Sequence, residues 1–526
     1  MSELTSKHQD NSLELSEELS DELKHIRRML KERLFVKSPA KKSKWRFVPT
    51  EQDGNEQDFQ SMLSRVFEDV NKPLEEKNYG NRQISRAFKY FYERLCDLSP
   101  EKTLSLLDKL LNTTLVTIEV ESHSDAFTLF ETINNRGIQL TPIELIKNNL
   151  LARVEKVREQ NGSDNFEFDM NSANDVWDQI AKRLNNDAKL QERFLRHLYN
   201  MFRGSKGIDL ENYHKASRSN LIKIYDLLIK RSPEKLLNLL DEQSRIYSAF
   251  FNFESALDLW DENAAVSLDN LSHLGAAPGY AFLLWSADIA LERDWPVKTV
   301  VDEVARLLTK WFFWRNLTDF PATRDLDQMF IRLTNKIFEA GKIDISDFMQ
   351  EARKELSSDT NMASTSRREE SLKGDIYKDK PEITRFVLCS IEEFHQTRET
   401  KIDLWAMHQN GKPILSMEHV LPKDGKLEGW IEMLKEHSDQ SVKEIRDRCT
   451  HKLGNLTLTG YNQNLGQKGF VRKRDQVDKF SNKMTGFKNG LYLNSRLREQ
   501  EDWNESAINE RTDELAKEVM EIFAFE

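Results

Sequence analysis

The stretch from about residue 150 to residue 350 constrains the fold more than any other part of the chain. It repeats the apolar spacing of buried helix faces and contains few glycines and prolines, which interrupt helices. Its aromatic clusters, such as Trp311-Phe312-Phe313-Trp314, follow helical spacing, a pattern that far more often fills a core than binds a ligand. The sequence therefore predicts an all-α middle domain at residues 151–355, to which we assign no chemistry.

The chain has 526 residues, which is too long for a single hydrophobic core, so we expect several domains. Ser357 to Ser371 combine Ser, Thr and clustered charges with little apolar content, which predicts an interdomain linker at 356–375. This division leaves an N-terminal domain at 1–150 and a C-terminal domain at 376–526.

Charge and cysteine usage exclude several classes of protein. The chain carries 77 Lys+Arg against 88 Asp+Glu, a net charge of -11, so affinity for nucleic acid must come from a local patch. Three widely spaced cysteines form no Cys-x-x-Cys pair, which argues against disulfide scaffolds and cysteine zinc sites and favours a reducing, cytoplasmic setting. No segment resembles a membrane span or a secretory signal, so we expect no membrane partner.

The N-terminal part begins with a predicted helix from Leu13 to Leu34, where apolar residues recur every three or four positions. Lys37 to Arg46 hold five basic residues and no acid, which indicates an exposed loop, either a solvated connector or a phosphate contact. Leu115 to Val120 is rich in β-branched residues and predicts a strand. Thr141 and Pro142 then open a new helix, because Thr caps helices and Pro fits their first turn.

The C-terminal domain holds the segment with the clearest chemistry. Its three parts are a Glu-His pair at a predicted strand end, a β-rich return strand that bears an asparagine, and a polar turn into a helix. They read Met417-Glu418-His419-Val420-Leu421-Pro422, Leu453-Gly454-Asn455-Leu456-Thr457-Leu458 and Asn462-Gln463-Asn464-Leu465-Gly466-Gln467-Lys468. Such a ββα unit suits phosphodiester hydrolysis, since a neutral His can take a proton from water while carboxylate and amide oxygens hold Mg²⁺ or Mn²⁺.

Each of these residues alone is uninformative, because a lone Glu-His pair is usually a surface pair and a lone Asn a turn residue. The joint pattern, however, resembles the DUF1524 branch of the HNH, or His-Me finger, endonucleases. Trp503, Ile508, Arg511 and Leu515 resemble the helix that closes such domains.

The resemblance implies a role for each matching residue. It implies His419 as general base, Asn455 as the residue that orients His419, and Lys468 as a phosphate-facing cation. It implies Glu418 and Asn464 as metal ligands, with Asn462 as the alternative to Asn464. Eight Lys/Arg against two Asp lie between Lys452 and Lys488, which indicates either a DNA-binding patch or a solvated face. The candidate DNA contacts are Lys452, Arg472, Lys473 and Arg474.

A second segment, Phe130 to Thr141, resembles DUF262 domains, and the two halves together resemble the GmrSD-type, modification-dependent restriction endonucleases of phage defence. The residues that match the DUF262 motif are Asn134, Arg136, Gly137 and Lys147. Asn134 and Gly137 could equally serve turn geometry. The Asp-Gly-Gln-Gln-Arg motif of DUF262 is absent, so we expect a truncated N-terminal domain without nucleotide binding or NTP hydrolysis.

These observations predict a mainly α, multidomain protein with helical N-terminal and middle regions, a small β element, and a C-terminal α+β domain that contains a ββα-metal (HNH) module. The leading hypothesis is a metal-dependent DNA endonuclease of the phage-defence type, whose substrates include base-modified phage DNA. The alternative is a non-catalytic or decayed DNA-binding subunit of a split restriction system, with nucleotide binding on a separate subunit. A helical scaffold without a nucleic-acid role is a third reading.

Overall fold

The computed structural model divides into two compact units, Met1–Glu119 and Val120–Glu526. The structure describes most of the second unit and parts of the first. The described residues are 21, 24–26, 28–30, 32, 35–36, 44–45, 59, 83–114, 142–161, 170–252, 259–339, 341, 344–423, 429–435, 441–478, 480 and 482–525. Within them the protein is mainly α-helical, as predicted, with two small two-stranded sheets.

The described part of the first unit includes a pair of consecutive helices and a short β-pair. Helices α4 (Gln83–Cys96) and α5 (Pro100–Leu111) follow one another, and Ser99 caps α5 by accepting a hydrogen bond from the Lys102 N–H. The described residues between 21 and 32 are helical, in agreement with the predicted first helix. Strands β1 (Phe35–Val36) and β2 (Lys44–Trp45) pair antiparallel, so Lys44–Trp45 of the predicted loop form a strand. The predicted strand at 115–120 lies outside the described residues.

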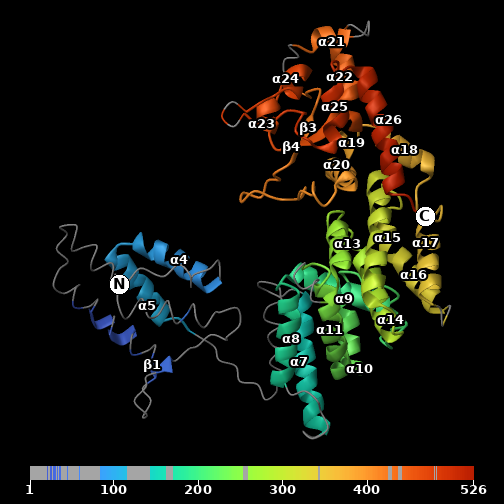
Figure 1. The fold of residues 1–526 in the computed structure, drawn as a ribbon. Helices are drawn as coiled ribbons and strands as arrows, with labels where there is room; N and C mark the ends of the chain where they lie inside the picture. Colours follow the sequence, from blue (N-terminus) through green and yellow to red (C-terminus); the bar gives the residue numbers. More distant parts are fainter. Residues whose placement is uncertain are drawn as a thin grey trace. The chain divides into compact units, whose positions relative to one another are not determined.

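The described part of the second unit begins with a helical array, which confirms the predicted all-α middle region (Figure 1). Helix α7 starts at Pro142, as the capping pattern predicted. The helices are α7 (Pro142–Asn161), α8 (Met170–Arg183), α9 (Ala188–Phe202), α10 (Leu221–Arg231), α11 (Pro233–Ser248), α13 (Glu262–Ser272), α14 (Gly279–Glu292), α15 (Val297–Thr318), α16 (Leu326–Glu339) and α17 (Ile345–Leu356).

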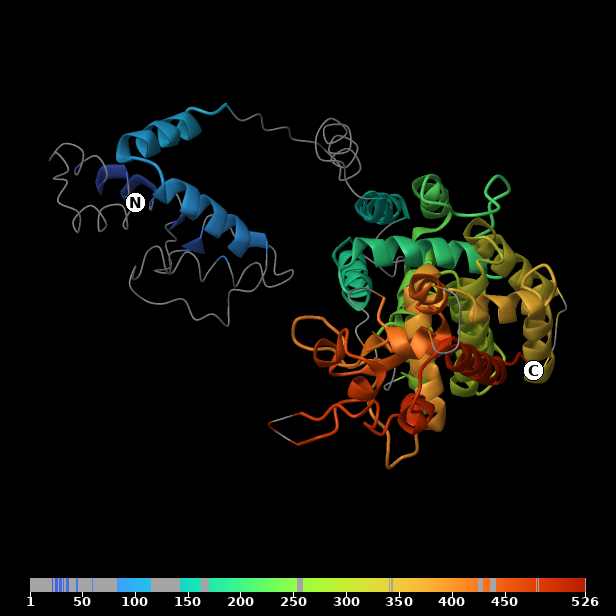
Figure 2. The same cartoon turned by 90° about the horizontal axis from the view of Figure 1, so that it is seen from above.

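The C-terminal part adds helices of varied length around a small sheet (Figures 1 and 2). Its helices are α18 (Thr365–Lys373), α19 (Ile376–Asp379), α20 (Pro381–His395), α21 (Ile431–Lys435), α22 (Val442–Cys449), α23 (Asn462–Leu465), α24 (Phe470–Arg474), α25 (Ser495–Glu499) and α26 (Glu505–Ile522). Its strands are β3 (Ser416–His419) and β4 (Leu456–Thr459), and the 3₁₀ turns of the unit are η4 (Thr323–Asp325), η5 (Leu453–Asn455) and η6 (Tyr492–Asn494). Among the described helices none is long and apolar enough to cross a bilayer.

The aromatic cluster of α15 fills the core, as predicted. Trp311, Phe312, Phe313 and Trp314 are each at most 2% exposed. The indole N–H of Trp314 donates to the Phe523 carbonyl, and the Phe313 and Phe523 rings stack 4.1 Å apart. The middle helices and the C-terminal helix therefore share one hydrophobic core.

The predicted linker at 356–375 is a folded segment. The Asn361 carbonyl accepts a hydrogen bond from the Trp311 indole N–H, and Ser364 caps α18. Helix α18 packs against α15 and α26, with Leu372 fully buried. The polar residues that suggested a linker serve as caps and hydrogen-bond partners, so this segment joins the two regions rather than separating them.

Candidate active site

The small sheet carries the two residues predicted to lie at the centre of the active site. Strands β3 and β4 pair antiparallel, with Glu418 opposite Thr457 and His419 opposite Leu456. Neighbouring side chains of a strand leave opposite faces. The Glu418 carboxylate accordingly contacts α24, whereas the His419 imidazole contacts α19.

The turn before β4 is fixed by close packing on α26. A Cβ built on Gly454 would lie 2.1 Å from the Ile508 carbonyl oxygen, so only glycine allows this approach. The buried Arg511 guanidinium donates to the carbonyls of Gly454 at 2.5 Å and Leu456 at 2.9 Å. The helix that the sequence identified by Trp503 and Arg511 thus holds the start of β4.

Asn455 is fully buried and acts on the backbone that follows His419. Its Oδ1 accepts from the Leu421 N–H at 2.8 Å, and its Nδ2 donates to the Leu421 carbonyl at 2.9 Å and the Thr450 carbonyl at 3.0 Å. The indole N–H of Trp503 also donates to Oδ1, at 3.3 Å. The predicted orienting residue therefore fixes the chain after His419, not the imidazole itself.

Glu418 forms a buried ion pair. The Lys473 Nζ, from α24, lies 2.5 Å from Glu418 Oε1 and also donates to the His419 carbonyl at 2.7 Å. Burial raises the pKa of the Glu418 carboxyl, although Lys473 opposes the rise, and burial lowers the pKa of Lys473. Lys473, predicted to contact DNA, is instead fully buried against the predicted metal ligand.

His419 is 9% exposed, and its Nε2 is buried with no hydrogen-bond partner. Its ring packs edge-on against Tyr377 at 4.5 Å and lies 5.8 Å from the ring of His451. Burial, with the nearby charges of His451, Lys423 and Lys473, lowers the pKa of His419 to about 3. The imidazole is therefore neutral near pH 7, the form that can accept a proton.

Two residues beside His419 were missed by sequence reasoning. Tyr377 stacks on His451 at 5.7 Å, and its N–H donates to the His451 carbonyl at 3.2 Å. The Nδ1 of His451 is buried without a hydrogen-bond partner. The one available signal was the position of His451 just before the Leu-Gly-Asn turn, and nothing in the sequence linked it to Tyr377.

Helix α23 lies beside β3 and carries the asparagines predicted for the metal site. Asn462 Nδ2 donates to the Met417 carbonyl at 2.8 Å and to Ser416 Oγ at 3.3 Å, so this amide ties α23 to the strand. Asn464 lies in the same helix, and its side chain is outside the described part of the structure.

The predicted DNA-contacting residues have different surroundings. Arg472 is exposed. Arg474 is largely buried and bonds Asp475 and Glu501, and Lys452 Nζ donates to Asn509 Oδ1 at 2.6 Å. Lys468, predicted to face the phosphate, is exposed and donates to Gln476 Oε1 at 2.7 Å. The charge of Arg474 is thus matched by carboxylates, whereas Lys452 and Lys468 donate to neutral amides.

The predicted DUF262 motif lies mostly outside the described residues. Asn134, Arg136 and Gly137 belong to that part. Lys147 is described in α7, and its Nζ forms an ion pair with Asp178 of α8 at 2.8 Å. The pair joins two packed helices.

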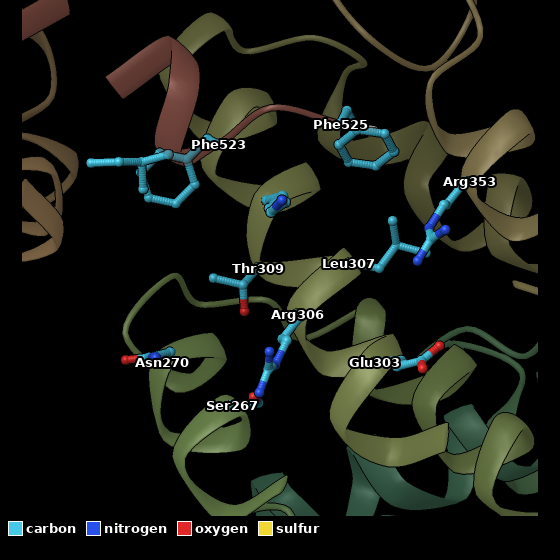
Figure 3. A pocket seen from close by; sticks show the side chains of 11 residues that line it. Ser267, Asn270, Glu303, Arg306, Leu307, Thr309, Arg353, Phe523 and Phe525 are labelled. Atoms are coloured by element: carbon cyan, nitrogen blue, oxygen red, sulfur yellow. The ribbon is translucent and has the colours of Figure 1, made fainter. Parts of the chain in front are cut away.

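The C-terminal part borders a groove and a pocket. A groove of about 890 Å³ lies at the end of the sheet away from His419, lined by residues that include Ser416, Tyr461 and Asn462. A pocket of about 400 Å³ is bounded by α13, α15, α17 and the chain after α26, with Arg306, Arg353 and Phe525 on its walls (Figure 3). Neither is lined by Glu418 or His419.

The residues of the site fit a hard divalent cation better than zinc. Among the described residues no three His, Cys, Asp or Glu side chains gather closely enough to hold a metal ion. Zinc requires such a set, whereas Mg²⁺ keeps several waters and binds through one or two carboxylates and substrate phosphates. Glu418 supplies a carboxylate, and the next residue, His419, has an unpaired Nε2.

Comparison with known proteins gives two family matches. Residues 363–518 match the model described as GmrSD restriction endonucleases, C-terminal domain, and residues 6–151 match GmrSD restriction endonuclease, N-terminal domain. The first match includes the whole β3–β4 site. The second gives no support to the predicted truncation of the N-terminal domain. A search of curated proteins found no match.

Proposed function

Because the chain belongs to the GmrSD family of restriction endonucleases, we propose that it cleaves DNA at the β3–β4 site by an HNH-type, metal-dependent hydrolysis with His419 as general base. The observation that supports this assignment best is the neutral, buried imidazole of His419 with an unpaired Nε2. A buried polar nitrogen without a partner destabilises a fold, and a catalytic role is one explanation for keeping it.

His419 would accept a proton from the attacking water at Nε2. A pKa of about 3 makes a weak base in the free protein. A bound phosphate places negative charge near the ring, which favours the imidazolium and raises its pKa towards neutrality. Substrate binding would therefore strengthen the base at the moment it is needed.

Glu418 would hold Mg²⁺ or Mn²⁺, which supplies charge neutralisation on the scissile phosphate and on the leaving 3′ oxygen. Asn464 is the proposed second ligand, on the helix next to β3. Asn455 keeps the chain after His419 in place through Leu421. Tyr377 and His451 pack around the imidazole and limit its orientation.

The exposed cations Arg472 and Lys468 are the proposed contacts to the DNA backbone. Such contacts are sequence-independent and position the duplex. We further propose base-modified phage DNA as a substrate.

A plasmid-nicking assay with Mg²⁺ or Mn²⁺ tests this function, on modified and unmodified DNA. Loss of a general base typically lowers a rate by about 10²- to 10⁴-fold, which is the expected effect of His419→Ala. His408→Ala is the matched control, because His408 is an exposed histidine of the neighbouring groove. Equal cleavage by wild type and His419→Ala would remove His419 from the mechanism, and DNA binding without any cleavage would favour a non-catalytic subunit.

A further inference from the structure

Lys473 connects the two central residues of the site. Its Nζ bonds the Glu418 carboxylate and the His419 carbonyl, so one ammonium fixes both members of the Glu-His pair. Both side chains of the ion pair are nearly inaccessible, at 1% and 6% exposure. A lysine buried in this way does not reach DNA, so its role must be carried out through Glu418 and His419.

The surrounding backbone is built to hold Lys473 in this position. The Lys473 carbonyl accepts from the Phe487 N–H at 3.3 Å, and its N–H donates to the Gly469 carbonyl at 3.0 Å. A Cβ on Gly486 would lie 2.2 Å from the Lys473 carbonyl oxygen, so the loop before Phe487 packs directly on the end of α24. The lysine backbone is therefore confined on both sides.

The ion pair changes how the site can bind a cation. In the free protein the charge of Glu418 is already balanced by Lys473 at 2.5 Å. A divalent cation at the same carboxylate would meet a like charge in a poorly solvated place. No further cluster of acidic side chains at the site, within the described residues, offsets that repulsion. Phosphate oxygens of bound DNA would supply the missing negative charge.

Resting on the nuclease function proposed above, we propose that Lys473 is a positioning residue that holds Glu418 by an ion pair and makes divalent-cation binding at this site depend on bound DNA. In the free protein the Lys473 ammonium holds the buried Glu418 carboxylate in place. When DNA binds, its phosphate compensates for the lysine charge.

Mn²⁺ binding, followed by the electron paramagnetic resonance signal of free Mn²⁺, tests this proposal without any cleavage reaction. The samples are the full-length protein with and without a phosphorothioate duplex that resists hydrolysis. After subtraction of the Mn²⁺ that the duplex binds alone, we expect the wild type to bind Mn²⁺ at least tenfold more tightly with the duplex. Equal Mn²⁺ affinity with and without bound duplex would overturn the proposal, and this measurement requires no variant.

Lys473→Met removes the charge and keeps an unbranched side chain. We expect its Mn²⁺ affinity without DNA to rise at least tenfold above wild type, and the effect of DNA to shrink. Lys473→Arg retains the charge and should keep the dependence on DNA. Unchanged or weaker Mn²⁺ binding by a folded Lys473→Met would contradict the proposal, because a purely structural lysine predicts that result.

Two controls separate the possible outcomes. Lys206→Met breaks a partly buried ion pair with Asp288, 2.8 Å long and remote in the sequence, and should leave Mn²⁺ binding unchanged. Glu418→Gln should abolish binding in either background. Duplex binding is measured separately by fluorescence anisotropy. A failure to bind DNA at all would count against the proposed function. The comparison of wild type and Lys473→Met without DNA would still decide the role of Lys473.

Discussion

The side-chain amide of Asn455 makes two hydrogen bonds to the backbone of Leu421: it accepts from the Leu421 N–H at 2.8 Å and donates to the Leu421 carbonyl at 2.9 Å. The two residues are 34 positions apart in the sequence. The Val420 N–H also donates to the Asn455 carbonyl, at 2.9 Å. The buried Asn455 therefore holds the backbone that follows β3. The orientation of His419, the last residue of β3, depends on Asn455 indirectly.

Asn455→Ala should destabilise the protein by about 3 kcal/mol, because buried backbone groups lose their partners. The free energy of unfolding in urea measures this loss. The asparagine at position 270, whose amide lines the pocket in Figure 3, gives the control Asn270→Ala, which should cost far less. Similar losses for both variants would show that the Asn455 hydrogen bonds contribute little.

Gly454→Ala should destabilise the C-terminal part, since the added methyl would lie 2.1 Å from the Ile508 carbonyl oxygen and 2.6 Å from the Thr512 nitrogen. Forced overpacking of this kind typically costs about 1–3 kcal/mol or more. Thermal unfolding checks the prediction. At Gly204 the nearest atom to an added Cβ is 3.9 Å away, so Gly204→Ala should change the melting temperature little.

Local sequence patterns were sufficient where neighbours along the chain determine the structure. The helical spacing of the middle region, the start of α7 at Pro142 and the burial of the Trp311 cluster all follow from such patterns. The pairing of the Glu-His strand with the Leu-Gly-Asn strand was also predicted, and the sheet confirms it.

Sequence patterns were insufficient where a distant partner decides the role of a residue. Lys473 looked like a surface cation because it lies among basic residues, yet its partner Glu418 is 55 positions away. The segment at 356–375 looked like a linker because its polar residues gave no sign of Trp311 as a hydrogen-bond partner. His451 was overlooked because only the fold places it beside His419.

The stability of the protein should fall as the pH drops below about 6.5. Burial lowers the pKa of His419 from 6.5 to about 3, and burial also lowers the pKa of His197. The unfolded chain therefore binds protons below pH 6.5 that the folded protein does not, so stability contributed by the neutral histidines is complete above pH 6.5 and is lost towards pH 3. His419 alone should account for about 2 kcal/mol between pH 6.5 and pH 5.

Urea unfolding at pH 7.5 and pH 5.0 measures this dependence. His419→Gln should reduce the pH dependence of the free energy of unfolding, because glutamine does not titrate. His408→Gln, at an exposed position, should leave this pH dependence as in the wild type. Identical pH dependence in wild type and His419→Gln would contradict the predicted shift.

Arg472→Ala should weaken DNA binding without destabilising the fold, because Arg472 is exposed while its neighbours Lys473 and Arg474 are held in buried or ion-paired positions. Each phosphate contact contributes about 0.9 to the slope of log affinity against log salt concentration. The slope for Arg472→Ala should therefore fall by about one, equally for all sequences. Arg498→Ala, at an exposed arginine paired with Glu499, is the control and should keep the wild-type slope. An unchanged slope in Arg472→Ala would place the DNA backbone elsewhere on the protein.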